Sequence, residues 1–213
     1  MNPIVTRLMS TVAGQLGHPH GRLGKLVARM LNRGNHPLIE AAVTAAEVTP
    51  TDAAADIGFG GGLGLTLLLG RVGTTGTVTG VELSADMLTR ARAEYAADVS
   101  SNRLRLVEGS LTGLPLPDGS LDAVITCNTI YFVPELDAAC AELARVLKPK
   151  GRLVIGIGDP DAMAKMPFTS YGFTLRPVAE VRAALERAGL TVDQREVTSR
   201  PMTGHLLIAR PTG

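Results

Sequence analysis

The chain has 213 residues, of which 45% are hydrophobic and 19% charged, and its formal net charge is +1. That length can bury a full hydrophobic core, and the composition excludes an intrinsically disordered chain. The near-neutral charge and 3% aromatic content argue against nucleic-acid binding, and only two cysteines, Cys127 and Cys140, exclude a disulfide scaffold. Without an apolar run of bilayer length or a signal-peptide pattern, we expect a cytoplasmic protein with no stable membrane insertion.

The first 44 residues are expected to form a basic helical arm ahead of a core over residues 45–213, all within a single domain. Five basic residues and no acidic residue precede Glu40. Apolar residues recur between these charges at helical spacing: Leu23, Leu26, Val27, Met30 and Leu31. Such a helix can dock on the core, close over a ligand site as a lid, form a dimer contact or lie on a membrane surface.

From residue 52 onward the pattern alternates between strands and helices. Apolar runs predict strands at Ala53–Ile57, Thr77–Leu83, Leu104–Glu108, Leu121–Thr126 and Arg152–Ile157. Helices are predicted at Leu63–Leu69, Ser84–Ala97, Pro134–Leu147 (closed by Lys148-Pro149-Lys150-Gly151) and Val178–Ala188. Leu190–Val197 and His205–Ala209 are expected to pair as a closing hairpin. This alternation indicates an α/β fold, a doubly wound and mostly parallel sheet with helices on both faces.

The first predicted strand ends in a glycine-rich loop, Asp56-Ile57-Gly58-Phe59-Gly60-Gly61-Gly62. A glycine turn before a helix exposes backbone N–H groups to an anion, which can be a pyrophosphate or a carboxylate. The dinucleotide fingerprint G-x-G-x-x-G fails in each of its three frames, because leucine occupies the last glycine position. The loop alone is weak evidence, since glycine turns also serve tight packing of a helix on a strand.

Polar residues and glycines follow the other predicted strands at the same edge of the sheet. Glu82 ends the second strand, 24 residues after Gly58, where an acidic residue can accept hydrogen bonds from ribose hydroxyls. Gly109, Asn128 and Asp159 follow the third, fourth and fifth strands. Because ligands bind at the carboxyl edge of an open α/β sheet, this edge is the predicted site.

Four motifs in this order resemble the class I S-adenosylmethionine-dependent methyltransferases. They are the glycine loop, Gly80-Val81-Glu82-Leu83-Ser84 with Met87, the segment Leu114–Asp122 and the segment Leu143–Leu153. The last two are similar to the branch related to ubiquinone and menaquinone biosynthesis. The resemblance covers about residues 45–210 and implies a Rossmann-like sheet of seven strands whose last two form the antiparallel hairpin.

The resemblance also implies a role for each matching residue toward S-adenosylmethionine. The methionine moiety is expected at Asp56, Gly58, Phe59, Gly60 and Gly62. The ribose is expected at Glu82, and the adenine at Leu83, Met87, Gly109, Ser110 and Leu111. Asn128 stands where the family's chain passes the sulfonium. Two positions depart from the family pattern. Phe59 occupies a position where the family often has Cys, and its larger side chain predicts a narrower methionine pocket. Ser110 stands where the family often has Asp, so the contact to the adenine amino group is expected to be weaker or made by backbone.

The acceptor pocket is expected beyond Asn128, with an apolar lining that favours a hydrophobic or aromatic small molecule. Its candidate residues are Asn35, Tyr131, Phe132, Met163, Met166 and Phe168. A general base helps only an acceptor that loses a proton, and Asp159 is the best-placed candidate. The sequence Gly158-Asp159-Pro160-Asp161 is also an ordinary turn. No metal-ligand spacing is present, so no metal is predicted.

These observations favour methyl transfer from S-adenosylmethionine to a small molecule on oxygen, carbon or nitrogen, by a monomer or homodimer. Two alternatives stand beside it. One is an adenosyl- or nucleotide-binding module without transfer activity. The other is an NAD-binding oxidoreductase with a degenerate glycine loop. Retention of labelled S-adenosylmethionine or of NADH distinguishes these alternatives.

Overall fold

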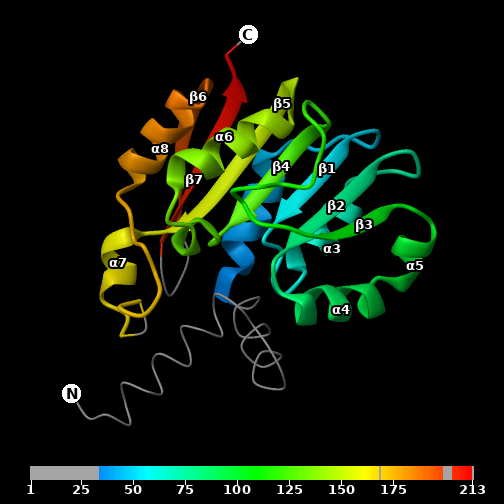
Figure 1. The fold of residues 1–213 in the computed structure, drawn as a ribbon, viewed down its shortest axis with the longest axis horizontal. Coiled ribbons are helices and arrows are strands. Elements are labelled where there is room, and N and C mark those ends of the chain that lie inside the picture. The colour runs from blue at the N-terminus through cyan, green and yellow to red at the C-terminus, as the bar shows by residue number, and fades with distance from the viewer. Residues whose placement is uncertain (1–33, 168, 199–202, 213) are drawn as a thin grey trace.

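A computed structural model describes residues 34–167, 169–198 and 203–212, and places them around one seven-stranded sheet (Figure 1). The strand order is β3-β2-β1-β4-β5-β7-β6. The strands are β1 Ala53–Ile57, β2 Thr77–Glu82, β3 Leu104–Glu108, β4 Leu121–Cys127, β5 Leu147–Gly158, β6 Leu190–Val197 and β7 Gly204–Pro211. Strands β1 to β5 pair in parallel, and β7 runs antiparallel to both β5 and β6. The predicted fold class, including the closing hairpin, is confirmed.

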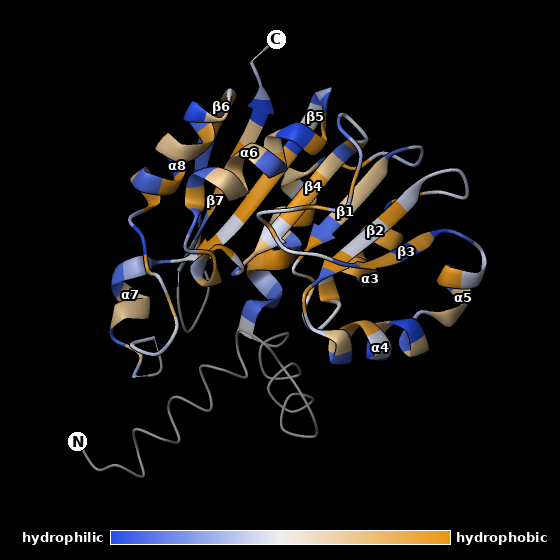
Figure 2. Ribbon diagram, viewed as in Figure 1, coloured by the Kyte–Doolittle hydropathy of each residue, from blue (hydrophilic) through white to orange (hydrophobic). Residues whose placement is uncertain are grey.

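Helices cover both faces of the sheet, because each face of a parallel sheet is apolar and must be buried. Helices α6 Leu136–Val146 and α8 Val178–Arg187 pack with one face into one core cluster. The helix over residues 34–45, α3 Leu63–Leu69 and α4 Ala85–Glu94 pack with the other face into a second cluster. Hydrophobic residues accordingly make up much of strands β4 and β5, as Figure 2 shows. None of the helices in the described ranges has the length and apolarity that a membrane crossing needs.

Three predicted boundaries are wrong, each for a local reason. The single helix predicted over Ser84–Ala97 is two helices, α4 and α5 Ala96–Ser100, with Ser84 as the N-cap of α4. The break falls at Tyr95, whose backbone is non-helical (φ −107°, ψ 29°) and whose hydroxyl donates to the carbonyl of Gly62 at 2.8 Å. A contact with a distant loop therefore overrides local helix propensity.

The second wrong boundary is the segment Lys148-Pro149-Lys150-Gly151, which was predicted to close the preceding helix and belongs instead to β5. The register between β4 and β5 shifts in this region, from Leu121 opposite Leu147 to Ala123 opposite Arg152. Such an irregularity accommodates Pro and Gly within a strand, because the ladder is interrupted there.

The third is Asp159-Pro160-Asp161, predicted as a turn, which begins the short helix α7 Pro160–Ala164. Asp159 is its N-cap and accepts a hydrogen bond from the Ala162 amide at 2.8 Å. Proline is favourable at the first helical position, where its missing N–H has no helical partner to lose.

The helix over residues 34–45 is continuous across the expected boundary between arm and core, and it packs directly on the sheet. Leu38 lies over Gly156 of β5 and Gly204 of β7, so close that a Cβ on Gly156 would meet it at 3.2 Å. Arg152 of β5 donates to the carbonyl of Ala45 at 2.8 Å at the far end of this helix. The apolar stripe predicted at residues 23–31 lies outside the described residues.

This packing predicts that Leu38→Ala destabilises the fold by about 2–5 kcal/mol, because the lost methyls leave a cavity between helix and sheet. Urea unfolding measures the change. Leu67→Ala, in a half-buried position of α3, is the control and should cost less. Equal losses for the two variants would show that the helix over residues 34–45 is not held by the sheet.

Candidate active site at the carboxyl edge of the sheet

The loops after β1 to β5 meet at one edge because these strands are parallel and adjacent. This edge brings together the glycine loop after β1, Glu82 at the end of β2, Gly109 after β3, Asn128 after β4 and Asp159 after β5. The loops after these five strands therefore line one side of the sheet.

The three glycines predicted to contact the methionine moiety each have a positive φ, +74° at Gly58, +48° at Gly60 and +84° at Gly62. Residues other than glycine are strained in this region of backbone conformation. A Cβ on Gly58 would also meet the side chain of Thr129 after β4, at 2.6 Å from its Cγ2. At Gly60, by contrast, a Cβ would have nothing within 4 Å. The loop thus packs tightly against the protein at Gly58 and leaves open space beside Gly60.

Glu82 fixes the relation between the glycine loop and the end of β2. Its Oε2 accepts a hydrogen bond from the Gly60 amide at 2.9 Å, and its Oε1 accepts from Leu83 at 2.8 Å and Ser84 at 3.0 Å. The carboxyl is buried, with 7% of the residue exposed. Leu83 is 48% exposed and is the one large hydrophobic in the described ranges that solvent reaches so freely. An acidic group and an apolar side chain therefore stand side by side next to the open space at Gly60.

Asp56, two residues before Gly58, is a second buried acid at this edge, with 5% of the residue exposed. Burial, with a smaller contribution from the charge of Glu82, raises the pKa of Asp56 to about 8. Gly64 at the start of α3 leaves room for this carboxyl, since any Cβ there would collide with it. The free protein therefore carries this group in its protonated form near neutral pH.

The residues predicted at the adenine differ in exposure. Met87 and Leu111 are buried in the two core clusters, with 3% and 4% exposed. The Gly109 amide donates to the Glu82 carbonyl at 3.2 Å, and the Ser110 hydroxyl shares a hydrogen bond with Thr112. Phe59 also packs in the core, with 6% exposed. A ligand would thus meet Leu83 and the backbone of residues 109–111, while Met87 and Leu111 support them from below.

After β4, Asn128 adopts the left-handed conformation with φ +56°, and its backbone N–H donates to the Gly156 carbonyl at 2.8 Å. The Tyr131 hydroxyl accepts from the Gly158 amide at 2.6 Å and lies 3.3 Å from Asn128 Oδ1. Burial raises the pKa of Tyr131 well above its usual value. The residue is 3% exposed, and its ring lies near Phe173, which also packs on Phe132. Tyr131 therefore ties the loop after β4 to the end of β5.

Asp159 also pairs with His205 of β7, with Oδ2 3.2 Å from Nε2. Hydrogen bonds from the Ala162 amide and from His205 lower the pKa of Asp159. A carboxylate with a lowered pKa is a weaker general base, so the geometry favours its capping role. His205 is a site-edge residue that the sequence reasoning missed. Strand alternation placed it in the hairpin, and no motif links it to Asp159.

Among the remaining acceptor candidates, Met163 is buried in α7, while Met166 and Asn35 are half-buried. Phe168 lies outside the described residues. Another residue that the sequence reasoning missed is Thr129, whose hydroxyl donates to the Ile57 carbonyl at 3.4 Å and packs against Gly58. Its signal was its place directly after Asn128, where the loops of two neighbouring strands must meet.

Comparison with known proteins assigns this geometry to a family. Residues 55–155 match the model of a methyltransferase domain. Residues 55–155 are therefore similar to a class I S-adenosylmethionine-dependent methyltransferase domain. The predicted resemblance to this family is thus confirmed, and the match includes the glycine loop, Glu82 and the segment up to β5.

Two curated relatives extend this assignment. The chain is 32% identical over 126 residues to a 2-phytyl-1,4-naphtoquinone methyltransferase from Trichormus variabilis, covering 59% of this chain and 55% of the relative. It is 32% identical over 124 residues to an arsenite methyltransferase from Halobacterium salinarum, covering 58% of this chain and 30% of the relative. The chain therefore aligns with about a third to a half of the length of these relatives, and the first of them supports the predicted likeness to the quinone branch.

The methyltransferase fold is shown independently by solved structures. A SAM-dependent methyltransferase from Aquifex aeolicus superimposes with a TM-score of 0.71 at 22% identity, covering 87% of this chain and 97% of that chain. At this identity the likeness concerns the fold, and it extends well beyond residues 55–155.

The buried Asp56 predicts a pH dependence of stability. The pKa of Asp56 is 3.8 in the unfolded chain and about 8 in the folded protein. Between about pH 4 and pH 8, the native state therefore binds a proton that the unfolded chain has lost. Stability should therefore fall as pH rises from 4 to 8, by at most about 1.4 kcal/mol per pH unit, and level off above. Asp56→Asn should remove this slope. Urea unfolding at pH 5 to 9 measures it, and parallel curves for the two proteins would contradict the burial of an ionisable Asp56.

Proposed function

We propose that the protein transfers the methyl group of S-adenosylmethionine to a small-molecule acceptor. The observation that carries the proposal is the contact between Glu82 and the Gly60 amide at 2.9 Å, which sets an acidic group beside an open glycine loop. A ribose placed at Glu82 would put its substituents over the loop on one side and over Leu83 on the other. The methyltransferase domain over residues 55–155 contains all three residues.

The residues present fit this cofactor. The space beside Gly60 that a side chain would fill accepts an extended chain against the backbone, and exposed Leu83 offers an apolar surface to an adenine. Each carboxylate oxygen of Glu82 can accept more than one hydrogen bond, so a ribose hydroxyl can bind while the backbone amides stay in place. Direct cofactor contacts are proposed for Asp56, Gly58, Gly60, Gly62, Glu82, Leu83, Gly109, Ser110, Leu111 and Asn128, while the core residues Phe59 and Met87 would support them. When bound, the cofactor supplies a methyl carbon that its sulfonium already activates for displacement.

The protein's part in the reaction is to align the acceptor and to exclude water. The loop after β4, held by Tyr131, and α7 after β5 border the side of the edge where the acceptor would approach Asn128. Acceptor contacts are proposed for Asn35, Tyr131, Phe132, Met163, Met166 and Phe168. Because Tyr131 and Met163 are buried, they would act as the floor of this region, beneath the more exposed side chains. The apolar character of the set favours a hydrophobic or aromatic acceptor, and one relative's name specifies a naphtoquinone.

Equilibrium dialysis of the pure protein against labelled S-adenosylmethionine and, separately, against NADH tests the proposal. We expect retention of S-adenosylmethionine and none of NADH. Retention of NADH alone would replace the proposal with an oxidoreductase. Cofactor retention without methyl transfer to any member of a panel of quinones, phenols and aromatic amines would favour a binding module.

Within the cofactor site, Glu82→Gln should weaken S-adenosylhomocysteine binding by about tenfold. A hydrogen bond to a charged group contributes about 1.5–3 kcal/mol, and losing about 1.4 kcal/mol corresponds to that factor. Isothermal titration calorimetry measures the dissociation constant.

Glu108→Gln is the matched control, because Glu108 lies opposite Glu82 in the neighbouring strand and is exposed. It should bind S-adenosylhomocysteine as the unmodified protein does. If both variants keep full affinity, the ribose does not sit at Glu82.

A further inference from the structure

The loop between β3 and β4, residues 109–120, begins at the proposed adenine side of the site and is contacted by side chains of helix α6. Its backbone forms one isolated bridge, between Ser110 and Gly113, and is otherwise irregular. The side chains of Leu111, Leu114 and Leu116 are buried in the core cluster that contains α6. Hydrophobic burial anchors the loop to the domain, but burial is non-directional and does not orient its peptide groups.

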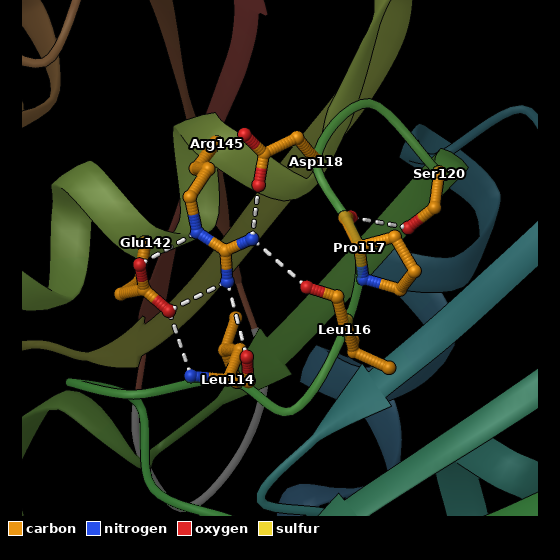
Figure 3. Close-up of polar contacts among 7 residues, drawn as sticks. All are labelled: Leu114, Leu116, Pro117, Asp118, Ser120, Glu142 and Arg145. Carbon is orange, nitrogen blue, oxygen red and sulfur yellow. Dashed lines mark hydrogen bonds and ion pairs between the residues drawn. The ribbon is translucent and has the colours of Figure 1, made fainter.

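Two side chains of α6 supply that orientation, as Figure 3 shows. The guanidinium of Arg145 donates to the carbonyls of Leu116 at 2.8 Å and Leu114 at 3.0 Å, and it also pairs with Asp118. Glu142 accepts from the Leu114 amide at 2.7 Å and from Arg145 through both carboxylate oxygens, at 2.7 and 2.8 Å. Arg145 lowers the pKa of Glu142, so the pair stays ionised. The planar guanidinium thus holds two carbonyls and two carboxylates in one fixed arrangement.

The residue between the two carbonyls is Pro115, and it transmits this arrangement to the site. A Cβ on Gly109 would lie 2.6 Å from Pro115 Cδ, so the proline ring rests directly against Gly109. The Gly109 amide in turn donates to the carbonyl of Glu82 at 3.2 Å. A continuous series of contacts therefore leads from Arg145 through Pro115 and Gly109 to Glu82.

We propose that Arg145 is a positioning residue for recognition of the adenine. It orients the backbone of residues 109–111 through Pro115, and this inference rests on the proposed function. Ser110 cannot accept from the adenine amino group as an ionised carboxylate would, and its hydroxyl already bonds Thr112. Discrimination of the base then depends on backbone groups, whose positions the Arg145 contacts determine.

Arg145→Met tests the proposal, because it keeps much of the aliphatic volume and removes all the hydrogen bonds. Calorimetry gives the dissociation constants of S-adenosylhomocysteine and of its analogue in which hypoxanthine replaces adenine. We expect the unmodified protein to prefer the adenine form. In Arg145→Met this preference should fall to near one, with adenine-form binding weakened by about tenfold. Arg145→Lys keeps the positive charge but loses the planar set of N–H donors, so its preference for the adenine form should be intermediate.

The control Arg187→Met removes a different arginine that pairs with α6, through Asp137 and not through a residue of the loop 109–120. It should leave both dissociation constants unchanged. Pro115→Ala removes the ring that touches Gly109 without changing any charge, and it should lower the preference as Arg145→Met does, so the test survives if the arginine variant does not fold. A lowered melting temperature with an unchanged preference would make Arg145 purely structural and overturn the proposal. Failure of the unmodified protein to bind S-adenosylhomocysteine would instead refute the proposed function.

Discussion

The carboxylate of Glu82 is the interaction on which the geometry of the edge depends. Three backbone amides, from Gly60, Leu83 and Ser84, converge on its two oxygens, so the loops after β1 and β2 are locked to each other. Without this contact, the positive-φ glycines would have the freedom to sample other conformations, since glycine restricts its own backbone least. In the proposed function, the same carboxylate binds the ribose. One buried acid would then both shape the loop and present a ligand-binding group.

Each of the other loops at the edge is fixed by its own polar contact. Arg145 orients the loop after β3, Tyr131 joins the loop after β4 to the end of β5, and the Asp159–His205 pair links α7 to β7. The hydrophobic core below sets the positions of strands and helices but not the directions of peptide groups in the loops. Directional hydrogen bonds, several of them to charged groups, supply what hydrophobic burial lacks.

Two acids at this edge, Asp56 and Glu82, are buried. The carboxylate of Glu82 accepts hydrogen bonds from three backbone amides. Burial and the charge of Glu82 raise the pKa of Asp56, which favours the protonated form of its carboxyl. A buried protonated carboxyl adds a cost to stability when it ionises, and it gives the site a group whose charge responds to pH near neutrality. The residue whose ionisation destabilises the fold, Asp56, is one that the ligand would contact. Perturbed pKa values often cluster at functional sites in this way.

The sequence by itself determined the fold class, the order of strands and helices, and the edge at which the site lies. These follow from local signals: apolar runs of strand length, helical periodicity, and glycines or acids at strand ends. Only the tertiary structure decided where Tyr95 breaks a helix, how β5 absorbs Lys148-Pro149-Lys150-Gly151, and that Tyr131 points into the core. It also paired His205 with Asp159 and Arg145 with the carbonyls of a distant loop. Such contacts join residues 20 to 50 positions apart, and their geometry depends on how the sheet packs, which no local pattern in the chain encodes.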